Sequence, residues 1–219
     1  NIRLTANGGG VGASYLWSTG ATTQVILVNI AGQYSVTVTT AAGCSATAFL
    51  PVATELVVNG SFTAGNTGFT SQYTYWPDIA GNNELVPDNG TNGYSVGTNG
   101  QNFHPNFWGI DHTNNSVGPR NFMLVNGHGT ISIWLETVTV VPNTEYYFSA
   151  WAMSLNNVGP FAKLQFEVNG APVGSIVNLT AGPSNATQAN ANTYWTRFYG
   201  TWNSGAVSGP INIRVINNE

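Results

Sequence analysis

The chain has 219 residues and a formal net charge of -4, and charged residues make up only 6% of it. An ordinary soluble domain carries about 25% charged residues. Polarity here comes instead from Asn, Thr, Ser and Gly, a pattern that we expect of a secreted or cell-surface protein. The five Lys and Arg residues are scattered, which excludes nucleic acid as a partner because phosphate binding needs clustered cations. No apolar run approaches the ~20 residues of a membrane span.

The length suits one large or two small domains. The first residues, Asn1 to Leu4, do not form a signal peptide, and they suggest the interior of a longer precursor. Cys44 is the only cysteine, so an intramolecular disulfide and a Cys-rich zinc site are excluded. We expect Cys44 to be a small buried hydrophobe; an intermolecular disulfide is the alternative.

The first 50 residues contain β-strand signals. Residues 24–29 and 34–40 are β-branched runs separated by a turn at Ala31-Gly32. In the second run Tyr34, Val36 and Val38 alternate with polar residues, which indicates a sheet with one solvent-exposed face. A third run follows Gly43 and ends before Pro51, and we expect Trp17, upstream, to lie in the core.

The rest of the chain continues the same pattern after a short linker at residues 51–54. The expected strands cover residues 121–126, 130–140, 145–153, 162–168, 173–178, 194–202 and 211–216. Asn169-Gly170 is a hairpin-type turn. Leu164, Phe166 and Val168 share one face, as do Ile211, Ile213 and Val215. No window shows a helical period over three turns, so the sequence predicts an all-β protein of sandwich or jelly-roll type.

Two family resemblances follow from these residues. Tyr15-Leu16-Trp17-Ser18-Thr19-Gly20, Ala31-Gly32-Gln33-Tyr34-Ser35-Val36 and Gly43-Cys44-Ser45 resemble the PKD-type, immunoglobulin-like modules of bacterial surface proteins. This resemblance implies an immunoglobulin-like domain over residues 1–53 that lacks its first strand.

The second resemblance is to jelly-roll modules of proteins exported by the type IX secretion system. It is carried by segments such as Leu56-Val57-Val58-Asn59-Gly60-Ser61-Phe62, His104-Pro105-Asn106-Phe107-Trp108 and Pro142-Asn143-Thr144-Glu145-Tyr146-Tyr147-Phe148. It implies a carbohydrate-binding-module-like jelly roll over residues 54–219, whose closing strand after Asn218 is missing, disordered or supplied by another chain. A strand from another copy, or from a flanking domain, is one way to complete such a fold.

The resemblance also implies a structural calcium site, for which Asp111 and Thr63 are the candidates. Related modules open Asn-Gly-Asp-Phe-Glu, whereas Ser61 and Thr63 stand in the place of the two acids. Because Ca²⁺ favours several hard oxygens, usually with carboxylates among them, Thr63 offers only a hydroxyl or a carbonyl.

The segment between Tyr73 and Arg120 has little strand signal but many aromatic residues, and such long irregular segments are often functional. Sugar recognition needs flat aromatic faces and planar amides or carboxylates. We therefore expect a ligand site made of Tyr75, Trp76, Asp78, His104, Trp108 and Asp111. The alternative is that these aromatics fill the end of the sandwich. Trp134, Trp151, Trp195 and Trp202 lie in expected strands, where core packing is favoured over a place on a concave binding face.

No catalytic motif stands out. His104, Asp111, His112 and His128 match no metal-site spacing. Glycoside hydrolysis needs two carboxylates that flank the bond, and Asp78, Glu84, Asp88 and Asp111 leave such a pair open. Gly-x-Ser-x-Gly is absent.

Three interpretations remain open. A non-catalytic module that binds a polysaccharide or surface glycan, as part of an adhesin or another surface protein, is favoured. A subunit or spacer of an extracellular filament, assembled by strand complementation, is the alternative. A hydrolase is the third.

Overall fold

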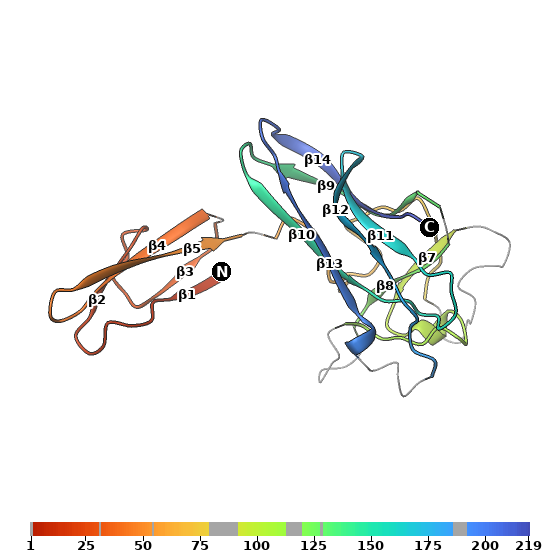
Figure 1. Cartoon of the computed structure of the whole chain (residues 1–219), viewed down its shortest axis with the longest axis horizontal. Coiled ribbons are helices and arrows are strands. Elements are labelled where there is room, and N and C mark those ends of the chain that lie inside the picture. The colour runs from red at the N-terminus through yellow and green to blue at the C-terminus, as the bar shows by residue number, and fades with distance from the viewer. Residues whose placement is uncertain are drawn as a thin grey trace. The chain divides into compact units, whose positions relative to one another are not determined.

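The computed structural model describes residues 2–30, 32–53, 55–78, 92–112, 120–127, 129–185 and 192–219. These residues form an all-β protein whose only helices, within those ranges, are two short 3-10 turns, Gly100–Asn102 and Asn192–Tyr194. The chain divides into two compact units, Asn1–Leu56 and Val57–Glu219 (Figure 1).

In the first unit, the residues that the structure describes form five antiparallel strands in two sheets. They are β1 (Ile2–Thr5), β2 (Ser14–Trp17), β3 (Val25–Val28), β4 (Gly32–Thr39) and β5 (Ser45–Val52). Strands β1 and β3 pair in one sheet, and the other sheet has the order β2-β4-β5. Trp17 is buried between Leu4, Ile26 and Val36 in a single apolar cluster, and its indole Nε1 donates a hydrogen bond to the carbonyl oxygen of Thr23 at 2.8 Å. The expectation that Trp17 is a core residue is confirmed.

The expectation for Cys44 is wrong, because its side chain is exposed. Cys44 lies in the tight turn between β4 and β5, where its carbonyl oxygen accepts a hydrogen bond from Thr40 N at 2.8 Å. Gly43, with φ +86°, reverses the chain directly before it. A turn this short lies at the tip of its hairpin and has no second layer of residues that could cover a side chain.

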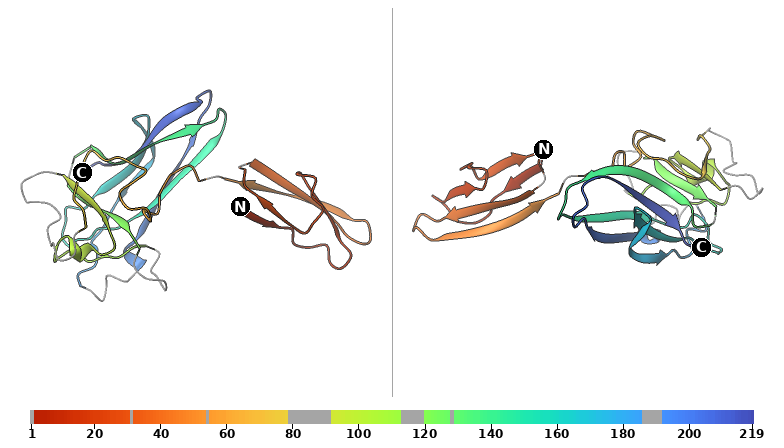
Figure 2. Two further views of the ribbon diagram at one scale, coloured as in Figure 1. Left: turned by 180° about the vertical axis from the view of Figure 1, so that it is seen from behind. Right: turned by 90° about the horizontal axis from the view of Figure 1, so that it is seen from above.

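The described residues of the second unit form nine strands. They are β6 (Thr74–Tyr75), β7 (Gly93–Gly97), β8 (Phe122–Asn126), β9 (Ser132–Val140), β10 (Glu145–Ala152), β11 (Lys163–Val168), β12 (Ala171–Asn178), β13 (Thr196–Asn203) and β14 (Gly209–Asn217). They form a four-stranded sheet β12-β11-β14-β9, the pair β10-β13 and the three-stranded sheet β6-β7-β8. Figure 2 shows the same strands from two further sides.

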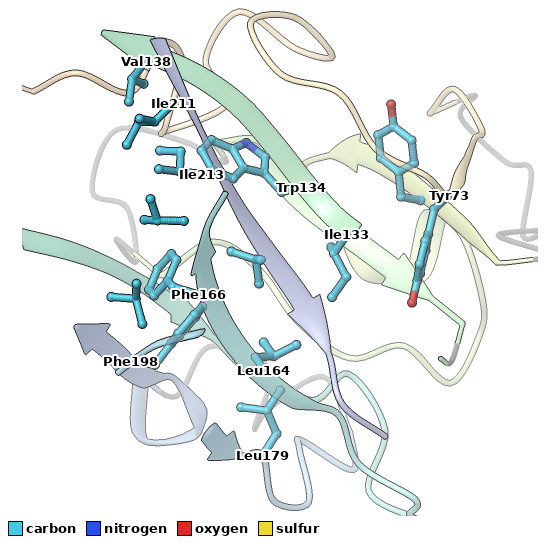
Figure 3. Packing of buried hydrophobic residues seen from close by; sticks show 14 of the residues in the cluster. Tyr73, Ile133, Trp134, Val138, Leu164, Phe166, Leu179, Phe198, Ile211 and Ile213 are labelled. Atoms are coloured by element: carbon cyan, nitrogen blue, oxygen red, sulfur yellow. The ribbon is translucent and has the colours of Figure 1, made fainter. Parts of the chain in front are cut away.

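The core of the second unit lies between the four-stranded sheet and the β10-β13 pair. Phe166 of β11 stacks on Phe198 of β13 with ring centroids 4.6 Å apart, and it contacts Phe148 of β10 at 6.0 Å. Ile211 and Ile213 of β14 complete this layer (Figure 3). Two sheets packed face to face over interleaved apolar side chains are the arrangement of a β-sandwich.

A pair of glycines allows β12 to approach β13 closely. A Cβ atom on Gly174 would lie 2.6 Å from the carbonyl oxygen of Tyr199, and the Cα atom of Gly200 would be 3.1 Å away. Gly174 also has φ +74°, a conformation that side chains with a Cβ atom rarely adopt. Position 174 therefore requires glycine for two reasons: its backbone conformation and the lack of space for a Cβ atom.

The expected strands are present, with ends shifted by at most two residues. The Asn169-Gly170 turn has positive φ at both residues, as a type I′ hairpin requires, and the two expected apolar faces on β11 and β14 are buried. Strand β5 continues through Pro51 to Val52, which an edge strand tolerates. Strand β7 was not expected, although every one of its residues is buried.

Among the described residues, no helix has the length and apolar character that crossing a membrane would require.

Candidate functional site

The outward face of β10 and β13 exposes three large aromatic side chains. The two strands are antiparallel, and their register places Tyr147 opposite Thr201, Ser149 opposite Tyr199 and Trp151 opposite Arg197. Side chains alternate along a strand, so Phe148 and Phe198 point into the core while these six residues point outward. Tyr147 is 54% exposed, Tyr199 60% and Trp151 44%.

The two tyrosines and Arg197 form one end of this face. The rings of Tyr147 and Tyr199 stack with centroids 5.9 Å apart and an interplanar angle of 27°. The guanidinium carbon of Arg197 lies 5.7 Å from the centroid of Tyr147, in a cation–π contact. Its Nη2 donates a hydrogen bond to Ser149 Oγ at 3.3 Å. These contacts hold the arginine flat on the sheet without burying it.

The other end is built on Trp151. The imidazole of His112 stacks on its indole at a centroid distance of 3.8 Å and an angle of 20°. Trp195 meets the same imidazole edge-on at 5.8 Å, and it packs against Phe122 of β8 at 6.3 Å. His112, from the irregular segment between β7 and β8, therefore reaches the sheet and packs on Trp151.

Burial next to these rings lowers the pKa of His112 below its ordinary value, and the negative charge of Asp111 partly opposes that shift. Desolvation penalises the charged imidazolium. His112 is therefore neutral at pH 7, and it contributes an aromatic ring to the face rather than a charge.

We name the exposed residues Tyr147, Trp151, Arg197 and Tyr199, together with the half-buried His112, the aromatic face. Tyr147 and Trp151 are four residues apart on one strand, which separates them by about 13 Å at the rise of ~3.3 Å per residue. Tyr199 lies between them along the strand direction, because it pairs with Ser149. Exposed Ser149 and Thr201 supply hydroxyl groups beside the rings.

The sequence did not predict this site, and the expectation that Trp151 packs in the core is wrong. Both faces of the segment 145–152 carry aromatic residues, so alternation alone did not tell inside from outside. The signal that could have done so is polarity: Glu145 and Ser149 share a face with Tyr147 and Trp151. By contrast, Trp134 is buried as expected.

The residues that the sequence did favour are divided between two environments. Tyr75 and Trp76 are neighbours, and Tyr75 is exposed, with its ring 5.3 Å from that of Tyr94. Trp76 is half-buried against the separate cluster around Phe103 and Phe122. The structure thus does not present Tyr75 and Trp76 as one flat surface.

The polar candidates are mostly engaged in local contacts. Asp78 accepts hydrogen bonds from Asn102 Nδ2 at 3.2 and 3.4 Å. Asp111 is 5% exposed, and its Oδ2 accepts a hydrogen bond from Arg120 N at 3.1 Å. The ring of His104 packs on Phe107 at 4.9 Å.

Trp108, the last of the loop candidates, is half-buried, and its backbone N–H donates to Leu155 O at 3.3 Å. Whether these loop residues bind a ligand stays a prediction. His128, Glu84 and Asp88 lie outside the described residues.

The loop around Thr63 is closed by amide groups. Asn59 Nδ2 donates to the carbonyl oxygens of Gly65 at 2.9 Å and Thr67 at 2.8 Å, and Asn121 Nδ2 donates to that of Phe62 at 3.0 Å. Carbonyl oxygens of such a loop are the ligands that Ca²⁺ would use, and here side-chain N–H groups already bind them. In the described ranges, no three His, Cys, Asp or Glu side chains gather closely enough to hold a metal ion. Calcium at Asp111 and Thr63 stays a prediction.

Comparison with known proteins gives no relative. No protein-family model, no curated protein and no solved structure matches the chain. The aromatic face is therefore interpreted from its own geometry.

Proposed function

We propose that the chain is a non-catalytic module that binds a polysaccharide or surface glycan, and that the aromatic face is its binding site. The observation that carries this proposal is the exposed row of Tyr147, Tyr199 and Trp151 on paired strands, with hydroxyl groups between the rings. Large exposed aromatic patches on a soluble domain commonly mark a binding surface.

The chemistry of the face suits sugars. The C–H faces of a pyranose ring pack on aromatic rings, whereas its hydroxyl groups need donors and acceptors such as Ser149, Thr201 and Arg197. Tyr and Trp supply this contact area at a low cost in side-chain entropy. The sheet backbone holds the rings in place before the ligand arrives, which lowers the cost of binding further. A row about 13 Å long accommodates several consecutive sugar rings rather than a single one.

A non-catalytic role is supported by the surroundings of the described carboxylates of the loop. Asp78 is engaged by an amide and Asp111 by a backbone N–H. A glycoside hydrolase needs two carboxylates that flank the scissile bond, and the inner part of the aromatic face presents hydroxyls and a guanidinium instead. The low charge content and the family resemblances favour a place at the cell surface, within an immunoglobulin-like plus jelly-roll protein.

Affinity gel electrophoresis against a panel of soluble polysaccharides tests the proposal. We expect retardation of the wild-type chain by at least one polymer, and loss of that retardation in Tyr147→Ala, Trp151→Ala and Tyr199→Ala. Tyr75→Ala is the matched control, because Tyr75 is an exposed tyrosine of the same unit that lies on β6, outside the aromatic face. If Tyr75→Ala and Trp108→Ala abolish binding while the three sheet variants do not, the site lies in the loops and the aromatic face is the wrong assignment.

A second candidate function, as a subunit or spacer of a filament, is favoured by strand β5. Seven of its eight residues are exposed, among them Phe49 at 66%. Within the described residues only β4 pairs with β5, so its other edge is open to a further strand, as in β-augmentation. Native mass spectrometry tests this candidate: oligomers that disappear in Phe49→Lys would support it, and a monomer at every concentration would remove it.

A further inference from the structure

The aromatic face carries a positive charge that no carboxylate neutralises within the described part of the chain. Within the described residues, Arg214 forms an ion pair with Glu167 on the four-stranded sheet. Arg197 forms no ion pair with a carboxylate there. The guanidinium contacts a neutral hydroxyl, Ser149 Oγ, and the face of the Tyr147 ring. The guanidinium is thus oriented by neutral groups and keeps its full charge.

The charged groups around this face leave that charge available. Glu145 is exposed on the same face of β10 and lies two residues from Tyr147, whose ring the guanidinium covers. In the described part of the chain it forms no ion pair with Arg197, which hydrogen-bonds Ser149 instead. Asp111, on the segment that reaches Trp151, is buried and turned to a backbone N–H. His112 is neutral at pH 7, because burial lowers its pKa.

A lone guanidinium over the tyrosine end of an aromatic row is a recognition element of its own. Arg presents a planar fork of N–H donors that matches a carboxylate, and charge-assisted hydrogen bonds of this kind are about twice as strong as neutral ones. A neutral sugar hydroxyl would accept a hydrogen bond there without the ion pairing and the two-pronged fit that a carboxylate gains. The whole chain carries a net charge of -4 with five basic residues, so a general attraction to polyanions is not expected. Any preference for an acidic ligand would arise locally at Arg197.

We infer that the ligand of the aromatic face is an acidic polysaccharide, in which sugar rings stack on Tyr147, Tyr199 and Trp151 while a uronate carboxylate pairs with Arg197. This inference rests on the proposed glycan-binding function and names the substrate class of the same site. It accounts for the stacked position of the guanidinium, since the Tyr147 ring and Ser149 hold the fork before the ligand arrives.

The experiment compares polymers that differ only in charge. Isothermal titration calorimetry measures the full chain with polygalacturonate, alginate and hyaluronate, each against its own methyl-esterified form. We expect at least one acidic polymer to bind about 10- to 100-fold more tightly than its ester, the range for a hydrogen bond to a charged group. Arg197→Gln should lose that preference and bind both forms alike. Arg197→Lys should recover only part of it, because an ammonium group lacks the planar fork.

Lys163→Gln is the matched control. It removes the same charge from an exposed residue of β11 whose neighbour, Leu164, points into the core, so that Lys163 lies on the opposite side of the unit. We expect this variant to keep the preference. Dextran sulfate serves as a generic polyanion, and its binding should be weaker than that of the preferred uronate.

The outcomes separate the two proposals. Equal affinity for acid and ester, or a preference that survives in Arg197→Gln, overturns the inference; if Trp151→Ala then abolishes binding to both forms, the glycan-binding function stands. Equal binding of dextran sulfate that Lys163→Gln also weakens means a nonspecific polyanion effect and overturns the inference as well. A chain that binds no polysaccharide overturns both proposals.

Discussion

Phe198 and Tyr199 are neighbours on β13 that face opposite sides of the sheet, and replacing each by Ala should separate stability from binding. Phe198 is 5% exposed and stacks on Phe166, whereas Tyr199 is 60% exposed. Truncation of a buried Phe to Ala costs about 3–5 kcal/mol, because it removes apolar contacts and leaves a cavity. A surface substitution of the second kind usually stays within about 0.5 kcal/mol.

Differential scanning calorimetry of the full chain measures both effects. For a domain the size of the unit Val57–Glu219, each kcal/mol moves Tm by roughly 2–4 °C. Phe198→Ala should therefore lower the Tm of that unit by roughly 6–20 °C, and Tyr199→Ala by no more than about 2 °C. Similar losses in the two variants would refute the assignment of inner and outer faces, and with it the aromatic face.

Three further predictions follow from individual contacts. Gly174→Ala should destabilise the second unit by about 2 kcal/mol or more, because its Cβ would clash with the carbonyl oxygen of Tyr199 and its φ is +74°; an unchanged urea midpoint would contradict the close approach of β12 and β13. Asn59→Ala should lower the free energy of unfolding by about 2 kcal/mol, because it removes the hydrogen bonds that Asn59 makes to its loop. An unchanged stability in urea unfolding would show that the loop does not depend on these bonds. NMR titration should give a pKa of His112 below 6.5, and a pKa closer to 6.5 in Trp151→Ala. Because the pKa is lower in the folded state, the stability that this group contributes is present above about pH 6.5 and is lost as the pH falls through the folded pKa. A wild-type pKa at or above 6.5 would show that the imidazole is not desolvated.

The strands could be predicted well because their residues alternate strictly. In β11 and β14 the apolar positions recur at every second residue. The dipeptide Asn169-Gly170 is typical of a type I′ hairpin turn. These signals are local, so the sequence contains them in full. Strand β7 lacks such a signal: it begins and ends with glycine in a segment rich in Gly and Asn, and its burial comes from partners that are distant in the chain, such as β8.

The candidate site was predicted less well, for a related reason. Aromatic content drew attention to the loop that contains Trp76 and Trp108, but exposure depends on what the fold places over each ring. Trp76 packs under its neighbours, whereas Trp151, on a regular strand, stays open to solvent. The stacking of His112 on Trp151 joins residues 39 positions apart, and nothing in the local sequence specifies that contact. The position of Arg197 beside the aromatic rings likewise depends on the register between β10 and β13, which the local sequence does not specify.

The most direct test of the central claim is an NMR titration that follows the indole N–H signals of the seven tryptophans as a soluble uronate oligosaccharide is added. A ligand on the aromatic face should shift the Trp151 signal strongly, with smaller changes at Trp195, and leave buried Trp17 and Trp134 unchanged. Shifts confined to Trp76 and Trp108, with Trp151 unaffected at saturation, would contradict the account and return the site to the loops.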